Sequence, residues 1–131
     1  MRRIIYISRS CIGGDQGALD AIVKAASKRN AARGITGLLW SNAGEFVQAF
    51  EGDDDAVGET MQRIRQDRRH VDLEIVCDRL VQSRLFGTWA MALPDQGPAS
   101  TASTAYLVGF GKSQGTPTAR RIVDMLLAAE R

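Results

Sequence analysis

A tight hairpin near the middle of the chain limits the fold more than any other feature of the sequence. Two strand-like runs, residues 35–41 and 45–51, are separated only by residues 42–44, which end in a glycine. A three-residue connection of this kind is typical of an antiparallel hairpin, because glycine takes up a positive φ at little cost. The two-residue period of the second strand places Gln48 between two aromatic residues on one face. The fold must therefore accommodate a sheet face that carries a carboxamide.

The segments around the hairpin complete the order of an α+β fold. An apolar stripe at helical spacing precedes Gly34, a residue suited to a helix C-terminus. Asp53–Asp55 supply an N-cap and the negative charge favoured at the start of a second helix. The predicted elements are a strand over residues 3–8, a helix over 15–33, the hairpin, a helix ending near 67, and strands over 72–81 and 89–93. This β-α-β-β-α-β-β order contains that of a ferredoxin-like sandwich, with two helices on one face of a mixed sheet.

The last part of the chain predicts a helical extension. Residues 94–117 are rich in Gly, Pro, Ser and Thr and favour a loop, with at most a short ordered piece around residues 105–108. Thr116 and Pro117 then begin a last helix, by the N-cap and first-turn proline rule. We expect its apolar stripe to be buried either on the helix-free face of the sheet or against a second molecule. That stripe consists of Ile122, Val123, Leu126 and Leu127.

Size and composition predict one globular unit. The chain has 131 residues, of which 44% are hydrophobic, enough for one core but not for two. We expect a domain over residues 1–94 and an extension, a loop plus a helix, over 95–131. The apolar stretches fall far short of the roughly 18 residues that suggest a membrane span. The positive N-terminus reaches the polar residues 8–10 before the apolar region of a secretion signal could form. No membrane partner is expected.

Cysteine and charge content exclude further classes of function. Cys11 and Cys77 occur without a CxxC motif or a cluster of histidines, which argues against a zinc site or a disulfide framework and for a reducing cytoplasm. The net charge is +2, from 17 basic and 15 acidic residues, and the basic residues are scattered along the chain. Such a distribution gives only weak support for nucleic-acid binding. We therefore predict a cytoplasmic protein without a metal site or a nucleic-acid partner.

A phenol and two carboxamides stand in a fixed frame along the chain. Asn30 lies 24 positions after Tyr6, Gln48 lies 18 positions after Asn30, and Trp89 lies 41 positions after Gln48. Taken singly, most tyrosines serve packing, and asparagine is common at helix ends. A glutamine between aromatic residues is harder to dismiss, since its burial without a partner costs about 1–3 kcal/mol. None of these groups is a strong acid, base or metal ligand, so their chemistry alone does not name a function.

Short motifs accompany this frame. They are Gly-Ile-Thr-Gly at 34–37, Glu-Gly at 51–52, Asp-Arg-Arg-His at 67–70, Phe86, and Trp-Ala-Met at 89–91. With these motifs, residues 2–93 resemble the BLUF family, sensors of blue light that hold a flavin. The resemblance implies a non-covalently bound flavin whose isoalloxazine ring lies between the two helices and against the sheet.

The same resemblance implies which residues would hold the flavin. Ile22 and Phe46 would line the apolar faces of the ring, and Asn30 and Arg63 would hold its pyrimidine carbonyls and ring N–H. Carboxamides suit this edge, because the flavin presents acceptors and a donor there and carboxamides offer both. More peripheral contacts are implied for Arg29, Asp67 and His70. FAD is expected, with FMN and riboflavin open, because the family's contacts concentrate on the ring.

For the light reaction, the resemblance implies a switch without substrate turnover rather than an enzyme. Tyr6 would give an electron and then a proton to the light-excited flavin through Gln48, and recombination would leave Gln48 rearranged at the flavin edge. The changed hydrogen bonds would bias a two-state element. That element would be the fifth strand, where Trp89 and Met91 share one face and could exchange places near Gln48.

The length of the chain favours a short, stand-alone photoreceptor whose output passes to a partner protein or rearranges a homo-oligomer. Two other functions stay open. One is a light-insensitive module of ferredoxin-like fold that binds a flavin or another heterocycle for regulation. The other is a small enzyme that uses Arg63 and Asn30 on a bound anion. The enzyme has less support, since the sequence shows no nucleophile–base pair, metal cluster or phosphate-binding loop.

Overall fold

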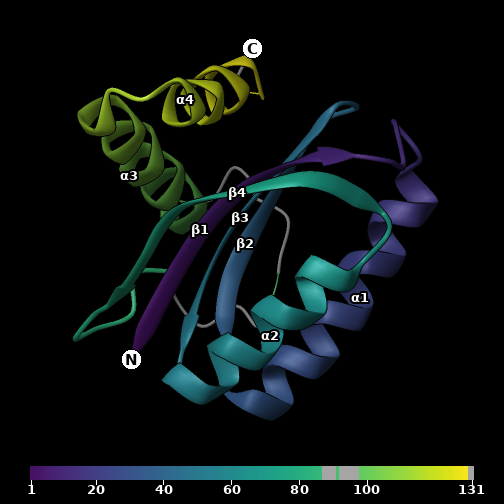
Figure 1. Cartoon of the computed structure of the whole chain (residues 1–131), viewed down its shortest axis with the longest axis vertical. Coiled ribbons are helices and arrows are strands. Elements are labelled where there is room, and N and C mark those ends of the chain that lie inside the picture. The colour runs from purple at the N-terminus through teal and green to yellow at the C-terminus, as the bar shows by residue number, and fades with distance from the viewer. Residues whose placement is uncertain (87–90, 92–97, 130–131) are drawn as a thin grey trace.

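The computed structural model describes residues 1–86, 91 and 98–129, and Figure 1 shows one sheet with helices on both of its sides. The strands are β1 (Arg2–Ser10), β2 (Thr36–Ser41), β3 (Glu45–Gly52) and β4 (His70–Leu80). The helices are α1 (Gln16–Arg33), α2 (Asp54–Gln66), α3 (Pro98–Gln114) and α4 (Pro117–Ala129). The order up to β4 is β-α-β-β-α-β, which confirms the predicted ferredoxin-like arrangement.

The sheet has the strand order β2-β3-β1-β4, and its three pairings are antiparallel. β1 lies inside the sheet, and all of residues 3–8 are buried. Among the described strands the expected mixed pairing does not occur, because β3 separates β1 from β2, the strand to which the α1 crossover leads. The predicted fifth strand, residues 89–93, lies outside the described residues apart from Met91, which belongs to no strand.

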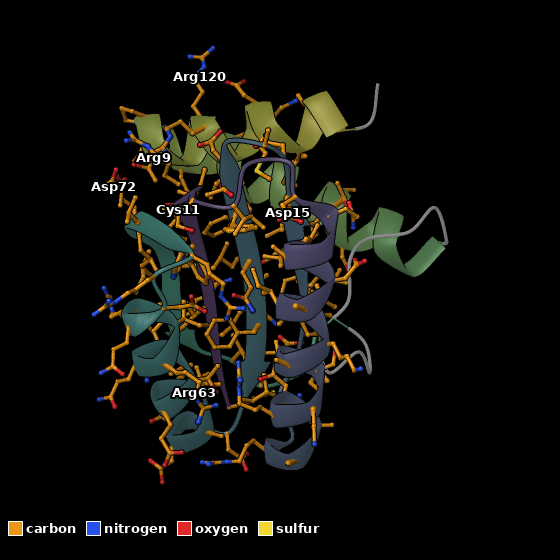
Figure 2. All side chains as sticks on the ribbon, turned by 90° about the vertical axis from the view of Figure 1, so that its right-hand side faces the viewer. Arg9, Cys11, Asp15, Arg63, Asp72 and Arg120 are labelled. Carbon is orange, nitrogen blue, oxygen red and sulfur yellow. The ribbon has the colours of Figure 1, made fainter. Side chains whose placement is uncertain are left out.

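Local sequence signals begin and end the two helices of one face. Asp15 caps α1, its carboxylate accepting a hydrogen bond from the N–H of Ala18 at 3.0 Å, and Gly34 ends the helix with a φ of 69°. Asp53 precedes α2 as predicted, but its side chain makes no capping hydrogen bond, so the acidic first turn of α2 is what favours the helix start. Figure 2 looks onto this face and shows α1 and α2 side by side.

The loop predicted over residues 94–117 is wrong for most of its length, because α3 occupies Pro98–Gln114. Gly, Ser and Thr have low helix propensity, but packing against a core overrides propensity. Leu107 is fully buried in that core, and the indole N–H of Trp40 donates to the hydroxyl of Thr104 at 3.1 Å. The short ordered piece expected in this region is the middle of the helix.

α3 and α4 cover the second face of the sheet (Figure 1), so both faces bury an apolar core. α4 begins as predicted, since the hydroxyl of Thr116 accepts a hydrogen bond from the N–H of Ala119 at 3.2 Å. From its apolar stripe, Ile122 and Leu126 join the core, whereas Leu127 remains 38% exposed. Part of the stripe therefore packs on the sheet, and an oligomer interface at this helix stays a prediction.

Several expectations concern the chain as a whole. In the part of the chain that the structure describes, no helix is long and apolar enough to cross a membrane. Within the same residues, no group of three or more His, Cys, Asp or Glu side chains is placed to hold a metal ion. Cys11 is exposed, Cys77 is buried, and both are free thiols. The domain boundary predicted at residue 94 falls outside the described residues and stays a prediction.

A buried ion pair ties the sheet to the segment after β4. Glu51 is fully buried and accepts hydrogen bonds from Arg3 Nε at 3.0 Å and from the backbone N–H groups of Leu85 and Phe86 at 2.5 and 2.8 Å. Arg3 also donates to the carbonyl of Ser83 at 3.1 Å and lies 5.7 Å from the centroid of the Phe86 ring. Burial of a charge is tolerated when it is paired and hydrogen-bonded in this way. The pair therefore holds the chain in place after β4.

Loss of this buried pair should destabilise the fold. Glu51→Ala should lower the free energy of unfolding by about 3–5 kcal/mol, because it leaves the Arg3 guanidinium buried without its partner. Glu59→Ala breaks the exposed pair with Arg33, at 2.5 Å, and should cost about 1 kcal/mol or less. Urea unfolding followed by circular dichroism measures both variants. Equal losses of free energy of unfolding in the two variants would contradict the larger contribution assigned to the buried pair.

Candidate functional site

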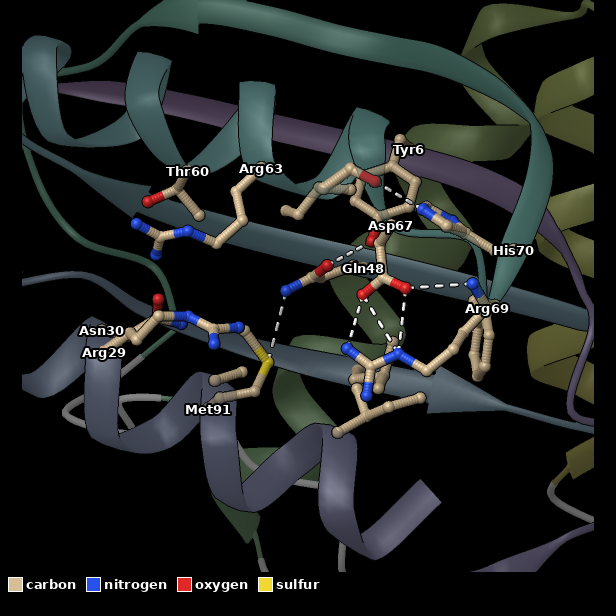
Figure 3. A pocket seen from close by; sticks show the side chains of 15 residues that line it. Tyr6, Arg29, Asn30, Gln48, Thr60, Arg63, Asp67, Arg69, His70 and Met91 are labelled. Atoms are coloured by element: carbon tan, nitrogen blue, oxygen red, sulfur yellow. Dashed lines mark hydrogen bonds and ion pairs between the residues drawn. The ribbon is translucent and has the colours of Figure 1, made fainter. Parts of the chain in front are cut away.

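A cleft between α1, α2 and the sheet collects the residues singled out in the sequence (Figure 3). The predicted site residues that line it are Tyr6, Ile22, Arg29, Asn30, Phe46, Gln48, Arg63, Asp67, His70 and Met91. The lining residues that sequence reasoning missed are Ala26, Leu39, Thr60, Ile64 and Arg69. Trp89, the other predicted signalling residue, lies outside the described residues.

The cleft is narrow. About 670 Å³ within it is free of protein atoms, part of it open to solvent, but the centre of a water molecule can reach only about 70 Å³. Side chains therefore occupy most of the room between the two helices and the sheet. Its walls include apolar side chains from both helices and from the sheet: Ile22, Ala26, Leu39, Phe46 and Ile64. Apolar walls together with a few polar groups are typical of a site for a small organic ligand.

The central polar contact follows from strand register. Tyr6 of β1 is paired with Gln48 of β3, so the two side chains are neighbours on the same face of the sheet. The Tyr6 hydroxyl donates a hydrogen bond to Gln48 Oε1, and both side chains are buried. Burial, and to a lesser degree the Asp67 carboxylate, raises the pKa of Tyr6 far above its usual value. The phenol is therefore neutral, with its proton directed at Gln48.

The other end of the Gln48 carboxamide contacts Met91. Gln48 Nε2 lies 3.5 Å from Met91 Sδ, a weak acceptor, and the Met91 side chain is buried. Ser27 of α1 donates its hydroxyl to the Met91 carbonyl at 2.6 Å, a contact for which a serine inside a helix gives no sequence signal. Gln48 thus uses its acceptor on Tyr6 and a donor on Met91. A rotation of the carboxamide would change both contacts at once.

Further polar groups come from the two helices. Within α1, all of whose residues are described, Asn30 is the one buried residue. Its backbone carbonyl accepts hydrogen bonds from the N–H groups of Gly34 and Ile35, which anchors Asn30 at the end of the helix. Arg29 and Arg63 are exposed on α1 and α2, and Figure 3 shows Arg63 reaching toward the Asn30 end of the cleft. This end therefore offers an amide and guanidinium donors to a ligand.

An ion pair lies just after α2. Asp67 Oδ1 accepts two hydrogen bonds from Arg69, one from its backbone N–H and one from its Nε, both at 2.9 Å. Asp67 Oδ2 lies 2.5 Å from Arg69 Nη2. These bonds from Arg69 hold the pKa of Asp67 below its usual value, and the pairing raises the pKa of Arg69. The backbone contact is an Asx turn, a conformation that Asp favours two residues before its donor. That tendency is the one sequence signal that could have found Arg69.

His70 is the first residue of β4, and its ring is held by protein partners. Nδ1 lies 2.7 Å from Ser8 Oγ, and Nε2 lies 2.6 Å from the carbonyl oxygen of Ile64. Because a carbonyl only accepts, Nε2 carries a proton and donates it to the Ile64 carbonyl, while Nδ1 shares a hydrogen bond with the Ser8 hydroxyl. The ring centroid lies 6.1 Å from that of Tyr6 and 6.4 Å from that of Phe46. His70 therefore packs against the site with both of its nitrogens already engaged.

Comparison with known protein families shows to which family this chain belongs. One family model matches residues 1–92, and its description is "Sensors of blue-light using FAD". The chain belongs to the BLUF family. This match confirms the resemblance drawn from Tyr6, Asn30 and Gln48. It also confirms the expectation of a flavin-based light sensor.

The chain is also similar to individual proteins of this family. The chain is 41% identical over 83 residues to photoactivated adenylate cyclase subunit beta of Euglena gracilis. The matched residues are 63% of this chain and 10% of that protein. The dark-state structure of BlrB, a BLUF protein, matches with a TM-score of 0.71 at 25% identity, over 99% of this chain and 96% of its own. BlrP1 of Klebsiella pneumoniae, solved with FMN and cyclic diGMP, matches with a TM-score of 0.66 at 32% identity, over 72% of this chain and 25% of its own. The chain spans about a tenth of the length of the curated relatives it matches first.

The lining of the cleft fits the flavin of the BLUF family. Gln48 and Asn30 each offer a donor and an acceptor, Arg63 offers donors only, and the flavin edge presents acceptors together with one N–H. The apolar walls suit the faces of the ring. The chemistry of the lining therefore fits the ligand of the family.

The ion pair of Asp67 and Arg69 should contribute to the pH dependence of the free energy of unfolding. Because the pKa of Asp67 is lowered by folding, its contribution is present above about pH 4 and is lost as the pH falls through the folded-state pKa. In Asp67→Asn the free energy of unfolding should therefore fall less steeply below about pH 4 than in the wild type. Urea unfolding of the flavin-free protein across this range measures both profiles. Asp124→Asn, at an exposed position of α4, controls for the loss of one carboxylate. Superimposable profiles of wild type and Asp67→Asn would rule the contribution out.

Proposed function

We propose that this BLUF domain senses blue light through Tyr6 and Gln48 and passes the change to Met91. The observation that carries the proposal is a series of contacts inside the cleft, from the Tyr6 hydroxyl through the Gln48 carboxamide to the Met91 sulfur. All three side chains are buried, so water does not compete for these contacts. A change at the middle group therefore reaches both of its neighbours.

The light reaction follows from what these groups can do. A bound flavin supplies, when it absorbs blue light, a one-electron oxidant. Tyr6 would supply the electron, and its phenolic proton would follow along the hydrogen bond that it already shares with Gln48 Oε1 and pass through Gln48 to the flavin. When both return to Tyr6, Gln48 would be left with changed hydrogen bonds. Nothing is consumed, which is the behaviour of a switch.

We assign the remaining lining residues to holding the ring. Asn30 and Arg63 bind its pyrimidine edge, and Ile22 and Phe46 cover its faces, in keeping with their places in the lining. We assign more peripheral contacts to Arg29 and Asp67, which also line the cleft. A contact from His70 would come from the carbon edge or face of its ring, because both nitrogens are engaged by the protein.

FAD is the flavin we propose, because the family description names it. The ring contacts are the same for FMN and riboflavin, and BlrP1 was solved with FMN. Arg29 and the neighbouring Lys28 are exposed on α1, where they could meet the phosphates of a flavin tail. Chromatography of the flavin released by heating the purified protein identifies which form is bound.

The output we propose is intermolecular. The changed contacts of Gln48 act on Met91, and the signal passes along the segment that carries Trp89 and Met91 to a partner protein or to a second copy of the chain. Absorption spectra of the purified protein before and after blue illumination test the sensor itself. A reversible shift in the flavin band supports it, whereas an unchanged spectrum with bound flavin would favour a light-insensitive flavin-binding module.

Tyr6→Phe should abolish the light-induced spectral shift while flavin stays bound, because the substitution removes the phenol that supplies the electron and proton but keeps the ring that packs in the cleft. Tyr106→Phe, which alters the other tyrosine, on α3, should leave the shift unchanged. Difference spectra under continuous blue light measure both variants. A full shift in Tyr6→Phe would remove Tyr6 from the mechanism.

A further inference from the structure

The ion pair of Asp67 and Arg69 shares the cleft with the phenol that gives up the electron. Both residues line the cleft together with Tyr6. Figure 3 shows the Asp67 carboxylate with Arg69 on one side and the contact between Tyr6 and Gln48 on the other. The carboxylate is also the charged group that, after burial, contributes to raising the pKa of Tyr6. The phenol and the carboxylate therefore interact electrostatically.

The backbone fixes this pair relative to Tyr6. The Arg69 carbonyl accepts a hydrogen bond from the N–H of Cys11 at 2.8 Å, and the next residue, His70, is paired with Ser10 of β1. The carboxylate accepts the backbone N–H of Arg69 as well as its side chain. β1 is the strand that carries Tyr6. The charges are thus attached to that strand by backbone hydrogen bonds and not by long side chains alone.

Loss of an electron creates positive charge on the phenol. A carboxylate close by stabilises that charge, and a guanidinium close by opposes it. In the wild type the two effects offset each other in part, because the groups are paired and at different positions relative to the ring. The balance between them then sets how readily the phenol is oxidised.

We propose that Asp67 promotes and Arg69 restrains the loss of an electron from Tyr6 in the light reaction. The inference rests on the proposed function. The electron would pass from the phenol to the light-excited flavin, which is the oxidant, the proton would follow through Gln48, and both would return to Tyr6. Asp67 and Arg69 exchange no atom in this step and act by their field alone.

The size of the effect follows from the exposure of the pair. The side chains of Arg69 and Asp67 are 42% and 28% exposed, so solvent screens part of their field. A fully effective neighbouring charge changes a protonation equilibrium by about one to three powers of ten. After screening, we expect each single substitution to change the rate of electron loss by about two- to fivefold.

Opposite charge changes provide the test. Electron loss from Tyr6 shortens the emission lifetime of the bound flavin, so this lifetime reports the rate. Arg69→Gln leaves the Asp67 carboxylate unpaired and should shorten the lifetime by about two- to fivefold. Asp67→Asn leaves the Arg69 guanidinium unpaired and should lengthen the lifetime by a similar factor. The emission lifetime of the double variant should be close to that of the wild type. Arg68→Gln removes the same charge from the exposed neighbouring residue and should have little effect.

A second background separates the field from structural damage. In a Tyr6→Phe protein none of these substitutions should alter the lifetime, because the donor on which the field acts is gone. Changes of the same sign in Arg69→Gln and Asp67→Asn, or equal changes with and without Tyr6, would overturn the inference. If Arg69→Gln does not bind flavin, the lifetime of Asp67→Asn decides the sign alone, and a lifetime equal to or shorter than that of the wild type would overturn the inference.

A readout without flavin checks the pair itself. In flavin-free Arg69→Gln the acid-dependent part of the stability assigned to Asp67 should be lost, because the guanidinium that lowers its pKa is absent. A wild type that holds flavin but shows no light-induced shift would instead refute the proposed function. A normal shift combined with lifetimes of the wrong sign would refute only the role of the ion pair.

Discussion

The pairing of β1 with β3 is the constraint on which the site depends, because it alone brings Tyr6 and Gln48 together. Side chains alternate along a strand, so a slip of one residue would turn Tyr6 into the opposite core and Ile5 into the cleft. Both faces of β1 are buried, and Ile5 and Ile7 are packed among the residues that α3 and α4 cover. Apolar residues with no part in the light chemistry therefore hold the photochemical pair in register.

The α1 side of the cleft is where the molecule departs from ordinary packing. The apolar stripe of this helix is only partly buried, and the one residue that it buries is the amide of Asn30. A surface helix normally buries its apolar stripe and leaves its amides in water. The inversion makes sense if a flat ligand forms part of the core, with its faces against the apolar stripe and its edge against the amide. Ligand binding and the stability of this half of the domain are then linked.

Much of this arrangement could be predicted because its signals are local. The hairpin connection and the glycine that ends α1 are each recognised from a few residues, and the two-residue period gave the face of Gln48. The contact of Ser27 could not be predicted, because Met91 is brought to it by tertiary structure. The pair of Asp67 and Arg69 is local, but the place of Arg69 in the lining of the cleft depends on the fold. α3 was missed for a related reason. A Cβ on Gly111 would lie 2.6 Å from Val123 Cγ2 and 3.1 Å from the carbonyl oxygen of Ala119, so a glycine that favours a loop in sequence is the place where α3 and α4 meet.

β3 is common to both halves of the molecule. Gln48 faces the cleft, while its neighbours Val47 and Ala49 lie in the core beneath α3 and α4. β2 has the same alternation, with Leu39 in the cleft and Trp40 hydrogen-bonded to Thr104 of α3. A close-packed interior transmits displacement, because it has no voids to absorb it. Any light-driven shift of the β3 backbone at Gln48 must therefore be accommodated by the helices on the opposite face, whether or not Met91 moves as well.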